Sequence, residues 1–162
     1  VLPSGPREVS GEPHPAAKLP AVTRGNRLDS EILAAAKKAW GTGRTYLREY
    51  QIADENLWMS ITFLKRAKAE LLLLDTSLLP SWTRELDTNI GEAEGILDQE
   101  YRHVKLNFVK FYQSGDYEQA DKVIERAIRM IPEREDERHQ YMRNQQKRIR
   151  QLKDGRSRSW GG

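Results

Sequence analysis

Two acid–histidine pairs carry the most specific chemistry in this sequence. Glu100 and His103 stand three positions apart, and Asp136 and His139 repeat the spacing. Residues i and i+3 share one face of a helix, so each pair could offer a carboxylate and an imidazole to a metal ion. A carboxylate-bridged di-metal centre needs two such Glu-x-x-His pairs and two further glutamates. The second pair is only a near echo, since it begins with Asp, and we expect neither a metal site nor a cofactor.

Other reactive groups are too few for a catalytic site. The chain has no cysteine, and its only other histidine is His14. Disulfides and thiolate ligands are therefore excluded, and a three-histidine zinc site is not expected. The sequence has no phosphate-binding glycine loop and no nucleophile motif, and Gly41-Thr-Gly43 alone is a weak signal. The sequence predicts a protein that is not an enzyme.

Positive charge is concentrated near the C-terminal end. The 162 residues carry 27 Lys and Arg against 24 Asp and Glu, a net charge of +3. Between residues 138 and 158, eight basic residues stand against Asp154 alone, so this stretch has a charge of +7 and the remainder −4. Tyr141 and Trp160 are the aromatic residues nearest to it that could stack on bases. The basic tail comprises Arg148, Arg150, Arg156 and Arg158.

We interpret this basic stretch as a solvated helix that covers the open end of the fold, because its charges are spread around the helix. Phosphate contacts would nevertheless support weak, nonspecific binding to nucleic acid. A nucleic-acid-associated protein that uses the basic C-terminal helix and tail is therefore the alternative function. Contact with an acidic protein or membrane surface is a further open alternative.

Composition indicates one very polar domain with narrow buried stripes. Hydrophobic residues make up 38% and charged residues 31% of the chain, and the mean hydropathy is −0.78. Five of the seven prolines lie in the first twenty residues. We expect residues 1–28 to form a Pro-rich disordered linker or tail, 29–153 a helical domain, and 154–162 a basic flexible tail.

No segment of the sequence is suited to crossing a membrane. The most apolar run, AELLLLDTSLLPSW, is interrupted by Asp75 and is too short for a bilayer. The N-terminus has no apolar segment typical of a targeting signal. We expect a cytoplasmic protein. Because the chain begins with Val1, an exported or periplasmic protein that has lost a signal peptide is the alternative.

Apolar residues at spacings of three and four predict five helices, near residues 30–52, 55–75, 82–113, 117–131 and 135–152. No strand pattern competes. Asp29 or Ser30 is the expected N-cap of the first helix, and the short joint after it predicts an antiparallel hairpin. The first stripe comprises Leu33, Ala36, Trp40, Gly43, Leu47 and Tyr50, and the second Leu57, Ile61, Leu64, Ala67, Leu71 and Leu74.

The third predicted helix is unusually long, and its apolar seam approaches a heptad register. A two-helix coiled coil is therefore an alternative interpretation of this seam. The seam of the third helix consists of Ile90, Leu97, Tyr101, Val104, Phe108 and Phe111.

Two glycines in the first helix, Gly41 and Gly43, each cost about 1 kcal/mol relative to alanine. This cost is tolerated where a neighbouring backbone comes close.

The stretch from residue 115 to 132 matches a known pattern of small and bulky residues: Gly115, Tyr117, Ala120, Ile124, Ala127 and Pro132. It resembles the second half of a tetratricopeptide repeat, in a unit of about 101–134. A degenerate echo occupies about 41–74, where Leu57, Ser60, Leu64 and Ala67 match, but the glycine and the proline are missing. The helix before the better unit departs from the family at Val104, Asn107 and Phe108.

The resemblance implies an all-α fold of antiparallel helical hairpins, stacked as a short array with a long third helix and a C-terminal capping helix. It also implies a non-enzymatic protein–protein interaction module, either an adaptor or scaffold or an assembly subunit, that binds a partner peptide or helix in a groove. In this family the first helix of each pair lines the groove, which would here place Arg102, Lys105, Val109 and Tyr112 against the partner. An unrelated helical bundle is the alternative to the repeat.

Overall fold

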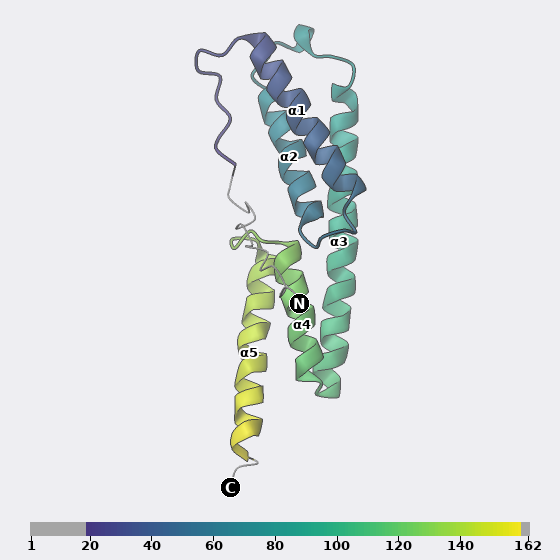
Figure 1. Cartoon of the computed structure of the whole chain (residues 1–162), viewed down its shortest axis with the longest axis vertical. Coiled ribbons are helices and arrows are strands. Elements are labelled where there is room, and N and C mark those ends of the chain that lie inside the picture. Colours follow the sequence, from purple (N-terminus) through teal and green to yellow (C-terminus); the bar gives the residue numbers. More distant parts are fainter. Residues whose placement is uncertain (1–18, 160–162) are drawn as a thin grey trace, which may run out of the picture.

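Five α-helices and one short 3-10 turn build the part of the chain that the computed structural model describes, residues 19–159 with side chains to Gly155 (Figure 1). No strand occurs in this range, so the predicted all-α fold is confirmed. Residues 1–18, the side chains of Arg156 and Arg158, and Trp160 lie outside the described residues. The elements are α1 (Asp29–Arg48), α2 (Asn56–Leu71), η1 (Thr76–Leu78), α3 (Thr83–Ser114), α4 (Tyr117–Met130) and α5 (Glu137–Ser159).

The long helix α3 is shared by two helix hairpins (Figure 1). The hairpin of α1 and α2 packs along its first half, and α4 packs along its second half with α5 against α4, so that α4 continues below α2. This arrangement makes the molecule elongated. Side-by-side stacking of the two hairpins, as in a tetratricopeptide array, is not confirmed, since the second hairpin follows the first along α3.

The helices α1 and α2 come together at Gly43. A Cβ atom at this position would lie 2.7 Å from Cγ of Leu64, which leaves no room for any side chain. The Ser60 hydroxyl donates a hydrogen bond of 2.8 Å to the Gly43 carbonyl oxygen, and both residues are buried. The predicted close approach at Gly43 is therefore confirmed, whereas Gly41 is exposed and has open space around it.

An aromatic pair connects α1 to the start of α3. The rings of Trp40 and Trp82 stack with their centroids 4.7 Å apart, and Trp40 Nε1 donates a hydrogen bond of 3.0 Å to Asn89 Oδ1. The guanidinium of Arg44 lies 4.7 Å from the centroid of the Trp40 ring. Trp40 is thus half-buried at the edge of the core. The buried stripe of α1 is correspondingly rotated from the predicted one and comprises Ile32, Ala36, Ala39, Gly43 and Leu47.

Two arginines hold the described part of the expected N-terminal linker, residues 19–28, against the end of α2. Arg24 donates a hydrogen bond of 2.8 Å to the Leu73 carbonyl oxygen and forms an ion pair of 2.6 Å with Asp29. Arg27 forms an ion pair of 2.8 Å with Glu70, whose side chain is buried. Both guanidinium groups therefore lie where α2 ends, and positive charge is favourable beside a helix C-terminus.

The turn between α3 and α4 has the residues that its geometry requires. Gly115 adopts a left-handed conformation with a φ of 74°, which glycine tolerates best. Asp116 then caps α4, since its carboxylate accepts a hydrogen bond of 3.1 Å from the Gln119 backbone N–H. The three residues that repeat along α4 at spacings of four and three, Ala120, Ile124 and Ala127, are all buried as predicted.

Several helix boundaries differ from the sequence predictions. The first helix ends at Arg48, well before Ile52, because residues 49–55 form the connection to α2. Leu28 is the N-cap of α1, where Asp29 or Ser30 was expected: its backbone N–H donates to the Glu31 carboxylate, at 2.9 Å. The last helix begins at Glu137 and continues to Ser159. Residues 154–159, which were expected to belong to a flexible tail, are therefore helical.

We predict that Gly43→Ala destabilises the protein by about 1–3 kcal/mol, because the new methyl group overlaps Leu64. Gly41→Ala on the same helix is the matched control and should stabilise it by about 0.5–1 kcal/mol, since alanine restricts the unfolded chain and meets no neighbour. Urea unfolding of both variants measures the two changes. Equal stability of the two variants would contradict the close contact of α1 with α2.

Candidate functional site

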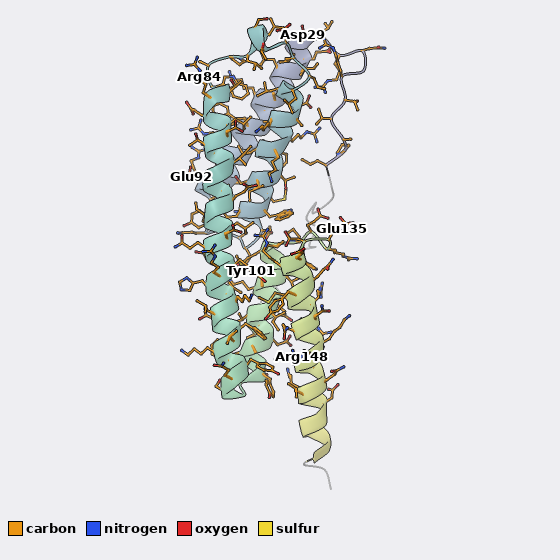
Figure 2. All side chains as sticks on the ribbon, turned by 180° about the vertical axis from the view of Figure 1, so that it is seen from behind. Asp29, Arg84, Glu92, Tyr101, Glu135 and Arg148 are labelled. Atoms are coloured by element: carbon orange, nitrogen blue, oxygen red, sulfur yellow. The ribbon has the colours of Figure 1, made fainter. Side chains whose placement is uncertain are left out.

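A cleft of about 900 Å³ lies where the two halves of the molecule meet. Its walls come from the first half of α2, the middle of α3, and the connection from α4 into α5. We call it the junction cleft. Figure 2 shows Glu135 beside the start of α5. The lining residues are Trp58, Ile61, Thr62, Lys65, Glu94, Leu97, Asp98, Glu135, Asp136, Glu137 and Arg138.

The junction cleft has an apolar floor and a charged rim. Ile61 and Leu97 are buried in the floor, and Trp58 is half-buried beside them. Five carboxylate side chains and two cationic ones surround this floor, which leaves an excess of three negative charges. The carboxylates belong to Glu94, Asp98, Glu135, Asp136 and Glu137, and the cations to Lys65 and Arg138.

Ion pairs hold part of the rim in place. Lys65 on α2 lies 2.6 Å from the Glu94 carboxylate on α3. Arg138 lies 2.6 Å from Asp98 and 2.9 Å from Asp136, so one guanidinium bridges α3 and the start of α5. Both cations of the cleft are thereby neutralised.

Asp136 organises the first turn of α5. Its Oδ1 accepts a hydrogen bond of 2.8 Å from the Arg138 backbone N–H, as a residue that caps a helix does. Hydrogen bonds from the Arg138 guanidinium hold the pKa of the Asp136 carboxyl below its usual range, although burial opposes this. Nearby, burial raises the pKa of Tyr101 to about 12, so its hydroxyl keeps its proton and can donate to the Arg138 carbonyl oxygen at 3.4 Å.

A second ionic cluster links the connection between α1 and α2 to α4. Asp54 accepts ion pairs from Arg126, at 3.1 Å, and from Arg129, at 3.0 Å. Arg126 also lies 3.3 Å from Glu100 on α3. These groups border a smaller hollow of about 550 Å³, in which Asp54 and Glu100 already have arginine partners. We therefore assign this cluster to holding the two halves of the molecule together.

Three of the four residues in the two acid–histidine pairs form structural contacts. Glu100 pairs with Arg126, and His103 is exposed to solvent. His139 is buried, and its Nδ1 lies 2.6 Å from the Ile131 carbonyl oxygen; since a carbonyl can only accept, Nδ1 carries the proton. No group of three or more potential metal ligands gathers among residues 19–159.

The residues predicted to line a partner groove do not face the junction cleft. Arg102 is exposed, and the Lys105 ammonium lies over the Tyr141 ring of α5, 4.8 Å from its centroid. Val109 is half-buried against the core. The Tyr112 ring packs beside Phe108 and Tyr117 and covers the α3–α4 turn. Their assignment to partner binding stays a prediction that none of these contacts supports.

The basic residues of α5 are spread along the helix from Arg138 onward, and Figure 2 shows Arg148 midway along it. Arg148 and Arg150 are exposed and form no ion pair with the described residues. Lys153 is held at 4.0 Å from Asp121 on α4. Past that point Asp154 and Gly155 are exposed, and Figure 1 shows α5 projecting beyond the α3–α4 turn.

Of the charged side chains of the cleft, sequence reasoning singled out only Asp136 and Arg138, and it assigned neither of them to a cleft. Glu94 and Asp98 stand four positions apart and flank Leu97 of the predicted seam, which was a usable signal for a charged flank. Their partners on α2 and α5 could not be read from the sequence.

Among the described helices, none combines the length and apolarity that crossing a bilayer requires.

Comparison of the chain with protein-family models, curated proteins and solved structures finds no match. The tetratricopeptide resemblance therefore stays a prediction, carried by the residues of α3 and α4 and by the degenerate echo in α1 and α2. The junction cleft is the feature from which a function can be argued.

We predict that Asp136→Asn lowers the free energy of unfolding by about 1 kcal/mol at neutral pH, because Asn can still cap the helix but loses the charged pair with Arg138. The folded-state pKa of Asp136 is lowered, so its stabilisation is present above the ordinary aspartate pKa and is lost as the pH falls through the folded value.

The difference in the free energy of unfolding between the wild type and the Asp136→Asn variant should therefore shrink below about pH 4. Urea unfolding across the acid range measures it, with Asp154→Asn, at an exposed position of the same helix, as the control expected to change nothing. A difference that is independent of pH would contradict the ion pair.

Proposed function

We propose that this chain is a non-enzymatic protein-docking module, an adaptor or assembly subunit, and that it takes a segment of a protein partner into the junction cleft. The observation that carries the proposal is the composition of that cleft, an apolar floor inside a charged rim. Protein interfaces have this anatomy, with a desolvated centre and a polar periphery.

The cleft offers an anchor position as well as charge. Trp58 is half-buried beside two buried aliphatic residues, and tryptophan is enriched among the residues that dominate binding energy. The rim carries an excess of negative charge, so it favours a cationic segment and repels phosphate groups. A basic peptide or helix end that also bears an apolar side chain is the chemistry that fits.

Nucleic-acid association is the second candidate function, and the exposed arginines of α5 favour it. Arg148 and Arg150 have no carboxylate partner among the described residues and are open to phosphate groups. Arg148 lies midway along α5, away from the first turn that borders the acidic cleft (Figure 2).

Thr62→Arg tests the docking function, because it places a long cationic side chain in the cleft. Thr42→Arg is its matched control: both threonines are half-buried on helices, and both hydroxyls donate to the carbonyl four residues earlier, at 2.9 Å for Thr62 and 3.0 Å for Thr42. We expect Thr42→Arg to bind a partner like the wild type, and Thr62→Arg to bind it at least about tenfold more weakly, a loss of about 1.4 kcal/mol.

Affinity capture from the native source with the three proteins, followed by titration of a captured protein, measures this. Equal capture by the wild type and Thr62→Arg would contradict docking in the cleft. Loss of partners with both variants would point to a general defect, which the melting temperatures of the variants would reveal.

A further inference from the structure

A hollow rich in positive charge lies along the first half of α5, between Glu135 and Arg148, which Figure 2 labels. It has a volume of about 500 Å³ and shares no lining residue with the junction cleft. Among the described residues that line it, three are cationic and none is a carboxylate. We call it the basic hollow. The lining residues are Arg134, His139, Gln140, Arg143, Asn144 and Lys147.

The basic hollow is formed by one face of α5 and the connection that precedes this helix. Gln140, Arg143 and Lys147 follow one another at spacings of three and four, so they share a helix face. Arg134 belongs to the connection from α4 to α5. Gln140 Nε2 donates a hydrogen bond of 3.3 Å to the Arg134 carbonyl oxygen, which ties the connection to that face.

Two buried polar side chains hold the guanidinium of Arg143 in place. His139 is 5% exposed and Gln146 is 4% exposed. Arg143 Nε donates to His139 Nε2 at 3.5 Å, and Arg143 Nη1 donates to Gln146 Oε1 at 3.2 Å. His139 Nε2 can accept because Nδ1 carries the ring proton. Of the five guanidinium N–H groups, three remain without a partner among the described residues.

The cations of the basic hollow have no counter-charge of their own. Arg134, Arg143 and Lys147 form no ion pair with a described carboxylate. Glu133 and Glu135 border an adjacent hollow, but both take part in other interactions, and neither pairs with Arg134 or Arg143. Three like charges around one concave surface create a local positive potential, so the basic hollow attracts an anion.

We propose that the basic hollow binds the phosphate group of a phosphate monoester. Arginine presents paired N–H donors that match two phosphate oxygens, and Arg143 is already held with such donors free. Arg134 and Lys147 add positive charge at the same place. A monoester carries about −1.5 to −2 charges at pH 7, more than the single charge of a nucleic-acid phosphodiester, so three cations favour the monoester. This inference goes beyond the docking function and does not depend on it.

Titration with phenyl phosphate, followed through the backbone amide signals in proton–nitrogen NMR spectra, tests the site. Sodium chloride keeps the ionic strength constant, so general screening does not change during the titration. We expect saturable shifts that centre on residues 134–147, with one ligand bound per chain. Methyl phenyl phosphate, a diester of similar size with one negative charge, should bind at least about tenfold more weakly.

Arg143→Gln should weaken the binding of phenyl phosphate at least about tenfold, because it removes charged hydrogen-bond donors. Arg148→Gln is the matched control: it makes the same charge change at an exposed position of α5 outside the hollow, and it should bind like the wild type. Since Arg143→Gln also leaves His139 and Gln146 without their partner, Lys147→Gln is the second variant. The Lys147 side chain has no described partner, and its loss should weaken binding about threefold or more.

A short peptide that carries one phosphoserine distinguishes the sources of the phosphate group. Tighter binding of this peptide than of inorganic phosphate supports a phosphorylated protein side chain as the ligand, and equal binding supports a small phosphate; both results support the site. Thr62→Arg, in the junction cleft, should bind phenyl phosphate like the wild type. Failure of the docking function and failure of the phosphate site are therefore distinguishable.

Three results would overturn the inference. The first is the absence of saturable shifts at constant ionic strength, and the second is an equal loss of binding in Arg143→Gln and Arg148→Gln. The third is binding of an oligonucleotide without terminal phosphates that is tighter than that of phenyl phosphate and weakens equally in both variants. This third result would assign the cations of α5 to a nucleic-acid surface.

Discussion

The helix α3 has to present one seam to two different hairpins, and the other contacts of the molecule follow from that constraint. Its 32 residues extend over about 48 Å. Toward its start Asp87 and Glu94 pair with lysines of α2, and toward its end Glu100 pairs with α4 while Lys105 lies over a ring of α5. The two hairpins contact each other sparingly, so their relative position depends on the straightness of α3. Gly91 and Gly95 are exposed with open space around them, and the helix continues through both.

Charged side chains reinforce this arrangement at the junction without dominating its stability. Exposed ion pairs contribute about 0–1 kcal/mol each, so their main effect is to select one geometry. Arg126 contacts both Asp54 and Glu100, so it links α3 to the connection between α1 and α2 and to α4. Arg138 contacts Asp98 and Asp136, so it links α3 to the start of α5. The apolar seam beneath them supplies the larger part of the stabilisation. The cleft exists because α2 and the start of α5 approach α3 from different halves and leave the space between them open.

Helix number, helix type and most of the core could be predicted from the sequence, because the spacing of apolar residues depends only on local geometry. Leu97, Val104 and Phe108 lie in the buried seam as expected, and the small residues of α4 are buried. The stripe of α1 was harder to place, since Trp40 sits at the edge of the core and stacks on Trp82, 42 positions away. The cleft depends on where residues near 58, 98 and 138 meet, and these contacts between distant residues have no periodic signal in the chain. The offset of the two hairpins along α3 could not be predicted from the sequence for the same reason.

The stacked indoles of Trp40 and Trp82 give this fold an optical signature of its own. Two indole rings whose centroids are 4.7 Å apart and whose planes differ by 19° couple their excited states. Such coupling splits the aromatic circular dichroism band into a pair of opposite sign, whose intensity falls steeply as the rings separate. Because one ring belongs to α1 and the other precedes the first turn of α3, the signal reports on the packing of α1 against α3. Trp58 lies in the junction cleft and outside this pair, so the couplet reports on the packing of α1 and not on the cleft.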